Sequence, residues 1–413
     1  MRRLTRRPRA GYLWVGLGLL AACAGCGGET PEASAPVGEE LERLRALGYV
    51  DFSSEVADRS NEGVVAPHPE LASPGYRLYV SGKQCTAELI DLEGTVLRSW
   101  SHQPCRKWSN AELLPDGDLV VPGMDPLPED GRRTFATGRY LLRLSWTGDV
   151  VWKRMMPAHH DMDLMDGGDL LVLSNQDRRV PELDDALVLD HQVTRLAADG
   201  TPRDSLSLYD VTRDNDIGFE LLTVAASGSR RKMDLFHANA IEPMRRPELA
   251  ERHPLYGLGN LLITLRHQNC VLVIDPEQRR LVWSWGQGEL LGPHDAQVLP
   301  DGHLLIFDNG MTREWSRVIE LDPVSETIVW EYRGEGEDAF YTSGRGSSQR
   351  LANGNTLLAN SNSGEAREVT PEGEVVWRFW NPRYNEEGQR AVIIRIKSYD
   401  ASFIEPLLER AGS

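Results

Sequence analysis

The sequence predicts an all-β protein, specifically a six-bladed β-propeller, from two observations. One pattern, a strand followed by a tight turn and a second strand, occurs five times along the chain. The two ends of the same region hold complementary parts of a sixth copy. We therefore predict a signal peptide at residues 1–22, a tether with a short helix at residues 23–74, and the propeller at residues 75–408.

The N-terminus has the composition of a secretory signal peptide. MRRLTRRPRA carries five arginines and no acidic residue, and the twelve-residue apolar run that follows is too short to span a bilayer permanently. The run ends at Ala22 and Cys23 in a sequence that resembles the lipobox of bacterial lipoproteins, which implies cleavage before Cys23 and acylation of its thiol. The alternative is an ordinary cleavage site with an incidental cysteine. We expect an exported protein, periplasmic or anchored to the outer membrane by lipid.

A tether and one helix are expected before the propeller. Residues 24–38 are small, acidic or proline, which is typical of a linker. Residues 39–49 place leucines at 41, 44 and 47, a spacing that predicts a short amphipathic helix. Helical patterns are nearly absent after this point.

The five complete copies are hairpins with an Asp-Gly, Gly-Gly or Asn-Gly turn, or with a longer insert. Turns of this kind between apolar runs indicate paired antiparallel strands. The copies are SNAELLPDGDLVV (109–121), HDMDLMDGGDLLVL (160–173), HANAIEP (237–243) with GNLLITLRHQN (259–269), HDAQVLPDGHLLIF (294–307) and GSSQRLANGNTLLA (346–359).

A second hairpin with a tryptophan follows the first, as in GTVLRSW, GDVVW, RRLVWSW, ETIVWEY and GEVVWRF. Two successive hairpins make a four-stranded sheet, and several such sheets in sequence indicate a propeller. Residues 76–100 supply outer strands without an inner strand, and residues 393–408 supply a strand without outer partners. Joined, they make a sixth blade that closes the ring. An open arrangement of hairpins would leave this complementary pair unexplained.

The charge balance excludes one class of partner. The chain has a net charge of −17, and removal of residues 1–22 with their five arginines makes it −22. Such an acidic protein repels phosphate backbones, so we expect no nucleic-acid partner. An anionic ligand would need a local group of cations.

The cysteines suggest one disulfide. Cys85 and Cys105 are twenty residues apart in a chain expected to be exported, so a bond between them would fit an oxidising compartment and would add roughly 3 kcal/mol of stability. Cys270 would be left as a buried strand thiol. Cys23 and Cys26 form a C-x2-C pair, but no second pair accompanies it as a four-ligand zinc site requires.

Histidines open three of the five complete copies. The first position is His160, His237 or His294 in these copies, and Ser109 or Gly346 in the other two. Equivalent positions of a propeller surround its central axis, so the three histidines are expected to converge. A random placement of ten histidines would rarely fill three of five equivalent positions.

Strand alternation adds two residues to this set. Asn239 lies two residues after His237 and shares its face. Arg266 ends the second strand of the same copy, where Asn175 and Asn309 stand in two others. An arginine at this place is a permanent cation available to an anionic ligand.

Other polar residues are expected outside the set. Asp161 and Asp295 point to the opposite face from the histidines that precede them, so we expect them to be hydrogen-bond partners in turns or between blades. His159 and His267 are likewise expected to face away. The remaining histidines are expected in turns, loops or on the surface: His68, His102, His191, His253 and His303.

The chain resembles the bacterial arylsulfotransferases that work without the nucleotide sulfate donor. The resemblance covers residues 75–405 and is most specific at FHANAI, LRHQN and GPHDAQVLPDGHLLIFDNG, with HHDMDL and DLFHANAIEP also matching. It implies a six-bladed propeller of the compact, lipoprotein-like branch. Larger members of that family carry a separate N-terminal β-domain, where this sequence has the tether and short helix.

The resemblance also implies roles for the histidine set. His294 matches the family's nucleophile, His237, Asn239 and Arg266 match the residues that hold the sulfuryl group, and His160 matches a further active-site histidine. It implies a phenolic sulfate ester as donor, a phenol as acceptor, a sulfohistidine intermediate and no cofactor.

This chemistry is consistent with the residue types. Sulfuryl transfer, like phosphoryl transfer, has a loose transition state that positioned donors stabilise. A nearby Arg266 would lower the pKa of the His294 imidazole and keep it nucleophilic. His160 or His237 could donate a proton to the departing phenol.

Two other functions remain open at this stage. Three histidines could hold a divalent ion in a metal-dependent hydrolase, although Arg266 would repel the ion. The propeller could also be a non-catalytic surface lipoprotein that binds a ligand.

Overall fold

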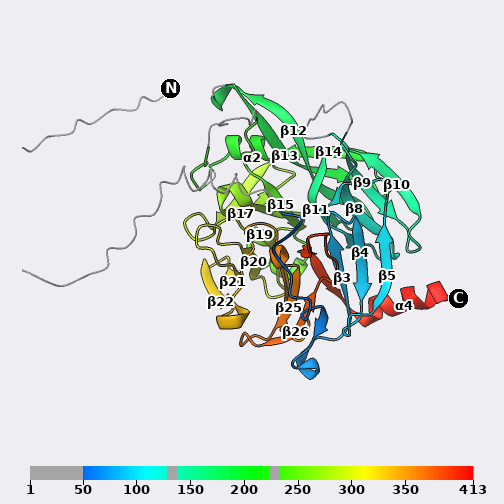
Figure 1. The fold of residues 1–413 in the computed structure, drawn as a ribbon. Helices are drawn as coiled ribbons and strands as arrows, with labels where there is room; N and C mark the ends of the chain where they lie inside the picture. Colours follow the sequence, from blue (N-terminus) through cyan, green and yellow to red (C-terminus); the bar gives the residue numbers. More distant parts are fainter. Residues whose placement is uncertain (1–49, 128–136, 184, 217, 224–231, 413) are drawn as a thin grey trace, which may run out of the picture. The chain divides into compact units, whose positions relative to one another are not determined.

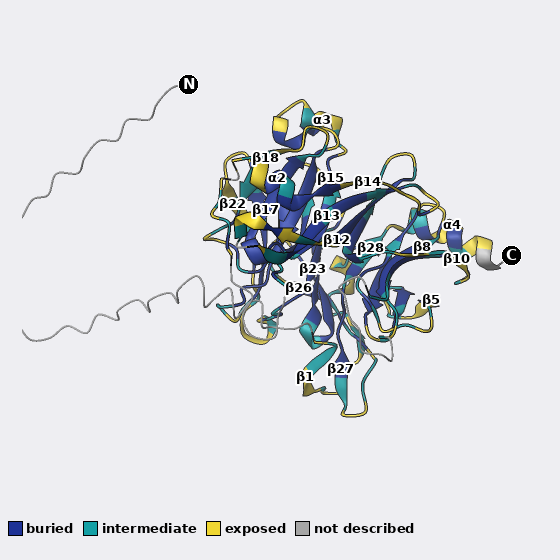
Figure 2. Ribbon diagram, turned by 90° about the horizontal axis from the view of Figure 1, so that it is seen from above, coloured by how far each residue is buried: buried dark blue, intermediate teal, exposed yellow. Residues whose placement is uncertain are grey.

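The computed structural model describes residues 50–127, 137–183, 185–216, 218–223 and 232–412. These residues form a six-bladed β-propeller, as predicted, with short helices at its periphery (Figure 1). The strands inside the blades are buried, and the exposed residues gather in the connecting turns (Figure 2). The predicted signal peptide, Cys23 and the helix expected at residues 39–49 lie outside the described residues.

Each blade is an antiparallel sheet. The strand that follows the connection from the preceding blade is the innermost one, nearest the central axis of the propeller. Blade 1 contains β28 (Ile396–Tyr399), β3 (Tyr76–Ser81), β4 (Thr86–Ile90) and β5 (Val96–Ser101). Blade 2 contains β6 (Lys107–Trp108), β7 (Glu112–Leu113), β8 (Leu119–Met124), β9 (Arg139–Leu144) and β10 (Val150–Met155). Blade 3 contains β11 (Ala158–Leu164), β12 (Leu170–Val180), β13 (Ala186–Leu196) and β14 (Pro202–Ser207).

The other three blades follow in chain order. Blade 4 contains β15 (Ala238–Pro243), β16 (Leu261–Leu265), β17 (Cys270–Asp275) and β18 (Arg280–Trp285). Blade 5 contains β19 (His294–Val298), β20 (Leu304–Asp308), β21 (Arg317–Asp322) and β22 (Thr327–Tyr332). Blade 6 contains β23 (Ser347–Arg350), β24 (Thr356–Asn360), β25 (Glu365–Val369), β26 (Val375–Trp380) and the added strand β2 (Gly63–Val65).

Helices and single turns occupy the connections. The α-helices of the described residues are α2 (Leu208–Asp214), α3 (Pro247–Ala250) and α4 (Ala401–Gly412). The 3₁₀ turns are η1 (Pro69–Leu71), η2 (Pro181–Leu183), η3 (Pro254–Tyr256), η4 (Arg266–Gln268), η5 (Gly336–Asp338) and η6 (Ser361–Ser363). Within the described part of the chain, none of the helices combines the length and apolar character needed to cross a membrane.

Several of the repeated tryptophans join one blade to the next. The Trp100 indole N–H of blade 1 donates to the Ser145 carbonyl of blade 2 at 3.1 Å. The Trp330 N–H of blade 5 donates to the Pro371 carbonyl of blade 6 at 2.7 Å. The Trp152 N–H of blade 2 has no such acceptor among the described residues, although its ring packs on Gly200 of blade 3.

The sheet of blade 1 contains both ends of the propeller. Strand β28 pairs with β3 in antiparallel register from Ile396 opposite Tyr79 to Tyr399 opposite Tyr76. Helix α4 follows and buries Ile404 and Leu407, so the segment expected to be strand throughout residues 393–408 is strand and then helix. Figure 1 shows α4 beside the strands of blade 1.

The predicted tether does not extend through residues 50–74. Strand β1 (Phe52–Val56) pairs with β27 (Gln389–Ala391), and β2 pairs with β26 of blade 6. Val64 and Ala72 pack on the apolar core of blade 6. The polar composition of this stretch concealed the pairing, because an edge strand gains its stability from backbone hydrogen bonds as much as from apolar side chains.

The cysteines are arranged as their spacing suggested. A disulfide joins Cys85 and Cys105, with a Cα–Cα distance of 6.3 Å. Cys270 is a buried free thiol in β17. Burial raises the pKa of this thiol, which keeps it protonated.

Irregular inner strands position the side chains near the axis. His160, His237 and Asp295 have positive φ angles of 53°, 47° and 50°. The strand register shifts around each of these places. Such bulges turn side chains away from regular alternation, so neighbours in sequence can face the same cavity.

Candidate active site

The structure brings the three repeat-opening histidines together at the inner ends of blades 3, 4 and 5. The rings of His160 and His237 contact each other with centroids 5.0 Å apart. His160 also lines a small cavity of about 40 Å³ together with His294 and Asn239. Residues separated by 134 positions in the sequence therefore share one site.

His294 is held in one orientation by its Nδ1 atom. This nitrogen contacts the Asn309 Oδ1 atom at 2.6 Å and the Gly292 carbonyl at 3.1 Å. The Asn309 amide nitrogen donates to the carbonyls of Thr342 and Arg345, so its oxygen must face the imidazole. Because both partners of Nδ1 are acceptors, Nδ1 carries the proton and Nε2 keeps its lone pair.

The Nε2 atom of His294 accepts a hydrogen bond from the Arg345 backbone N–H at 3.1 Å. Arg345 has a positive φ of 67°, which turns this N–H toward the imidazole. The lone pair that would attack a sulfuryl group is thus engaged by one donor. A neutral hydrogen bond of this kind contributes about 1 kcal/mol net, so a substrate can displace it at small cost.

Asn239 lies near the start of β15, and Arg266 directly follows the last residue of β16, so both lie beside these histidines. The Asn239 amide nitrogen donates to the Pro293 carbonyl at 2.9 Å, next to His294. Arg266 is buried in turn η4, and its guanidinium contacts the Nε2 atom of His267 at 3.0 Å. The positive charge of Arg266 lowers the pKa of His294.

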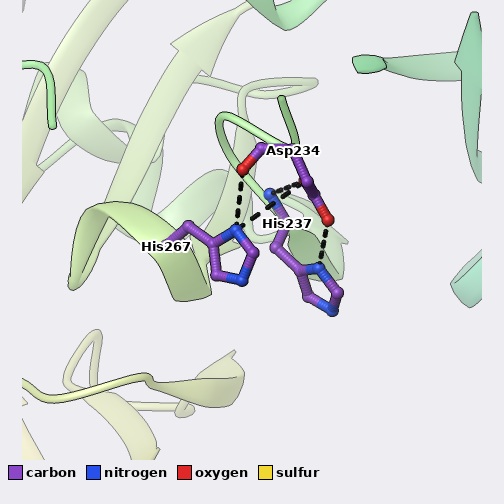
Figure 3. Close-up of side chains that lie close together, drawn as sticks. All are labelled: Asp234, His237 and His267. Carbon is purple, nitrogen blue, oxygen red and sulfur yellow. Dashed lines mark hydrogen bonds and ion pairs between the residues drawn. The ribbon is translucent and has the colours of Figure 1, made fainter. Parts of the chain in front are cut away.

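Asp234 holds three histidines in a cluster that sequence analysis did not identify. Its carboxylate contacts His237 Nδ1 at 2.5 Å, and its backbone carbonyl contacts His267 Nδ1 at 2.8 Å (Figure 3). The same carboxylate contacts His191 Nε2 at 2.9 Å. All three contacts are to oxygen, so these ring nitrogens carry protons. The opposite nitrogen of each ring is left as the basic one.

Three histidines were wrongly expected to lie away from the site. His159 contacts His160 through their Nδ1 atoms at 2.8 Å, because the bulge at His160 cancels the alternation of the strand. His267 faces the cluster because it belongs to turn η4 and not to a strand. His191 is buried on the long strand β13, with its ring 4.9 Å from that of His159.

Signals for three of the missed residues were present in the sequence. His159 adjoins His160, Asp234 lies within DLFHANAIEP, and His267 lies within LRHQN, the last two being stretches that carry the family resemblance. His191 belongs to a third strand outside the repeat alignment and carried no such signal. The other histidines agree with expectation: His68, His102 and His253 are in loops with some exposure, and His303 is in a turn.

Asp161 and Asp295 serve as links between blades, as predicted. The Asp161 carboxylate accepts from the Asn110 amide of blade 2 at 2.8 Å and from the Ile241 N–H of blade 4 at 3.0 Å. Asp295 accepts from the Ser348 N–H of blade 6 at 2.8 Å.

Arg395 binds both of these carboxylates at the centre of the ring. Its guanidinium pairs with Asp161 at 2.5 Å and with Asp295. A polar cavity of about 240 Å³ is lined by Arg395 and Glu242 among others, and it shares Arg395 with the small cavity of His294. Burial raises the pKa of Glu242 to about 7.

The site favours neutral histidines. Burial, followed by the charge of Arg266, holds the pKa of His294 well below its ordinary value. Burial, followed by the neighbouring His237, does the same for the pKa of His160. Burial also lowers the pKa of His237, but here the Asp234 carboxylate acts in the opposite direction.

A larger cavity of about 210 Å³ adjoins the small one and shares Ser109 and His160 with it. Its lining includes Lys107 and Arg139 of blade 2, besides His159, His191, His237 and Asp234. The two cavities together offer room for a group that reacts at His294 and for the remainder of the molecule that carries it.

The cluster of Asp234, His237 and His267 brings one potential metal-ligand atom from each residue within 4.8 Å of the others. These atoms already face one another as hydrogen-bond donors and acceptors. The Arg266 guanidinium, 3.0 Å from His267, adds a positive charge beside them. Protonated ring nitrogens and a neighbouring cation fit a divalent ion poorly.

Solved structures similar to this chain include a protein of unknown function from Bacteroides caccae, with 15% identity and a TM-score of 0.49 over 78% of this chain and 98% of that one. Virginiamycin B lyase from Staphylococcus aureus has 11% identity and a TM-score of 0.40 over 78% of this chain and 89% of that one. Both similarities are too weak to bear on function. No curated protein matches the chain.

A family model does match. The model of the arylsulfotransferase (ASST) family covers residues 110–382, which include every histidine of the site, Asn239, Arg266 and Asp234. The chain belongs to the arylsulfotransferase family.

Proposed function

We propose that this protein transfers a sulfuryl group from a phenolic sulfate ester to a phenol, with His294 as the nucleophile. The observation that carries the proposal is the hydrogen bonding of His294. Asn309 and Gly292 hold the proton on Nδ1, so Nε2 is the basic nitrogen, and His294 lines a cavity together with His160 and Asn239. Its lowered pKa keeps it unprotonated at neutral pH.

In the first half-reaction, Nε2 of His294 attacks the sulfur of the donor. An N–S bond forms while the bond between sulfur and the aryl oxygen breaks, and the electron pair of that bond leaves with the oxygen. The Arg345 N–H, released from Nε2, becomes a donor to a sulfuryl oxygen. Arg266 and the second amide hydrogen of Asn239 are further donors to the same group.

A proton from a histidine neutralises the departing phenolate, since a phenol with a pKa near 10 leaves more readily as the neutral molecule. We assign this proton to Nε2 of His237, the basic nitrogen of the neutral ring, which must therefore bind a proton before the phenolate departs. The Asp234 carboxylate 2.5 Å from its Nδ1 stabilises the doubly protonated ring. His160 contacts His237 and serves to position it.

The second half-reaction reverses these steps. The hydroxyl oxygen of the acceptor phenol attacks sulfur, its proton passes to His237, and the N–S bond breaks to restore the lone pair of His294. No metal ion enters either step. This is the second part of a ping-pong cycle.

Intact-mass measurement tests the proposal. The protein is incubated with 4-nitrophenyl sulfate and no acceptor, and we expect one added sulfuryl group. His294→Asn should show none, while His253→Asn, which changes an exposed loop histidine, should be modified like the unaltered protein. Absence of both adduct and donor turnover in the unaltered protein would rule out the transfer.

The metal-dependent hydrolase makes a different prediction. It requires a stoichiometric ion, loss of activity with chelators and water as the acceptor. Donor hydrolysis that is abolished by chelation, without any protein adduct, would favour that function over sulfuryl transfer. Donor binding without turnover or adduct would favour a non-catalytic binding protein.

We further propose that the protein is exported and anchored through an acylated Cys23. The arginine-rich start, the apolar run and the lipobox-like sequence support this, and the disulfide between Cys85 and Cys105 is typical of oxidising compartments. Metabolic labelling with palmitate should mark the protein, and Cys23→Ser should abolish the label.

A further inference from the structure

The larger cavity, which is lined by His160 and His237 but not by His294, contains two cations that the proposed transfer does not use. Lys107 and Arg139 lie in its wall, on strands β6 and β9 of blade 2. The cavity shares Ser109 and His160 with the small cavity of His294. A molecule that reacts at His294 can therefore extend past His160 toward these two side chains.

The cations are concentrated in a protein that is otherwise strongly acidic. Arg345 and Arg106 act on Lys107 as neighbouring positive charges, and Arg106 acts on Arg139 in the same way. Like charges placed together destabilise one another, and an anion between them relieves the repulsion. The net charge of −17 for the whole chain makes this a local feature.

Among the described residues, two carboxylates lie close to these cations. Asp51 lies 3.9 Å from the Lys107 amine and 3.7 Å from the Arg345 guanidinium. Asp234 lines the cavity but is already hydrogen-bonded to histidines. The Lys107 side chain is 26% exposed and that of Asp51 is 34% exposed, so the cavity opens to solvent at this end.

We propose that the aromatic ring bound in this cavity carries a second anionic group, a carboxylate in the simplest case, and that Lys107 and Arg139 bind it. This inference rests on the proposed function of His294. The ring would lie between the Met124 side chain and the imidazoles of His159 and His191. Its far substituent would then reach the basic end of the cavity.

The size of the cavity limits the substrate to a small one. A volume of about 210 Å³ is below the range of 300–1,000 Å³ typical of sites for drug-sized ligands. One ring with one short substituent fits this space better than a fused polycyclic phenol. The proposed substrate class is therefore a sulfated hydroxybenzoate-like monocycle.

The state of Lys107 agrees with an anionic ligand. Burial, followed by the charge of Arg345, lowers the pKa of Lys107 to about 7. A bound anion would favour the charged amine again. Measurements are therefore best made at pH 6.5, where the amine is mainly protonated in the free protein and Asp234 remains ionised.

Acceptor selectivity tests the proposal. We would compare kcat/KM for 4-hydroxybenzoate and for its neutral analogue 4-hydroxybenzamide, with 4-nitrophenyl sulfate as donor. The ratio of the two values is measured in the unaltered protein and in the double variant Lys107→Met, Arg139→Gln. Taking the quotient of these ratios cancels the intrinsic difference in reactivity between the two phenols.

We expect the preference for the anion to fall about tenfold in the double variant, as is typical for loss of a hydrogen bond between charged groups. Lys107→Arg should keep most of it. Lys153→Met is the matched control, since Lys153 lies on β10 of the same blade and pairs with Asp125 outside the cavity. An unchanged ratio in the double variant would overturn the proposal.

Calorimetric binding of the same two phenols, without donor, separates this inference from the proposed function. Tighter binding of 4-hydroxybenzoate that disappears in the double variant supports the anion site even if His294 never becomes sulfated. If His294 is sulfated but both phenols bind with equal affinity, the proposed transfer is supported and the proposed anion site is overturned.

Discussion

At the scale of single residues, the chemistry depends on how His294 is surrounded. Its ring is buried, its Nδ1 proton is directed at Asn309 and Gly292, and Arg266 adds a positive charge nearby. Burial and charge both disfavour the imidazolium ion, whereas a histidine in water would be half protonated near pH 6.5. The lone pair on Nε2 is therefore available well below neutral pH.

The pH dependence of His294 sulfation follows from this. In the proposed transfer only the neutral His294 ring attacks, so the rate is lost as pH falls through the pKa of His294 in the folded protein, and that pKa is lowered. Because 4-nitrophenolate is a good leaving group that needs no proton from His237, we expect the single-turnover rate with 4-nitrophenyl sulfate to be the same at pH 6.0 as at pH 7.5. A half-maximal rate near pH 6.5 would contradict the geometry described here.

Asn309→Asp provides a comparison for that profile. A carboxylate 2.6 Å from Nδ1 would stabilise the imidazolium ion and raise the pKa of His294. The acid limb of the rate profile should therefore move to higher pH, and the rate should fall less at pH 7.5 than at pH 6.0.

At the scale of elements, bulged inner strands place these side chains. Regular alternation would have sent His159 and His160 to opposite faces, yet the positive φ of His160 turns both toward the same cavity. Left-handed backbone at residues other than glycine costs about 1–3 kcal/mol and persists where the surroundings enforce it. Here the enforcing contacts are those of Asp161 and Asp295 between the blades.

Arg395 is the shared partner of those two carboxylates, so its removal should destabilise the inner strands. Arg395→Met would leave two buried aspartates without their cation, at a cost of about 3–5 kcal/mol. Urea unfolding would measure this. Arg154→Met, at an exposed arginine of β10, should change stability by less than about 0.5 kcal/mol. Equal effects of the two variants would show that Arg395 has no special structural role.

At the scale of the whole molecule, the ring is joined by backbone pairing and by tryptophans. Strand β28 pairs with β3, although their residues are more than 300 positions apart. Trp377 of blade 6 donates to the Leu92 carbonyl of blade 1 at 2.9 Å and holds the same junction. Since the active-site residues come from three blades, their spacing depends on this closed ring.

Truncation tests that dependence. Removing residues 396–413 deletes β28 and α4 and exposes the surface that buries Ile396, Ile404 and Leu407, each contributing about 1.5–3 kcal/mol. We expect loss of a single cooperative thermal transition and loss of His294 sulfation. A protein lacking only residues 409–413 should melt like the full chain, because the side chains of Glu409 and Arg410 are exposed. Full activity of the longer truncation would exclude a role for this strand.

Much of this molecule was predictable because repeats and strand patterns are local properties. The five hairpin copies predict the blades, and the incomplete copies at residues 76–100 and 393–408 predict the sixth. The equivalent positions of His160, His237 and His294 predict their convergence, since symmetry converts a place in the repeat into a place around the axis. The pairing of Cys85 with Cys105 needed only their spacing and an expected compartment.

Other features depend on contacts that no local pattern contains. His191 and Asp234 meet through a third strand and a loop that the repeat alignment does not relate, and bulges reverse the direction expected for His159. Strand β1 and strand β2 form because blade 6 and the segment of β27 offer them edges. Side-chain direction at a bulge and the pairing of an edge strand are set by partners far away in the chain, so they become defined only when the ring is assembled.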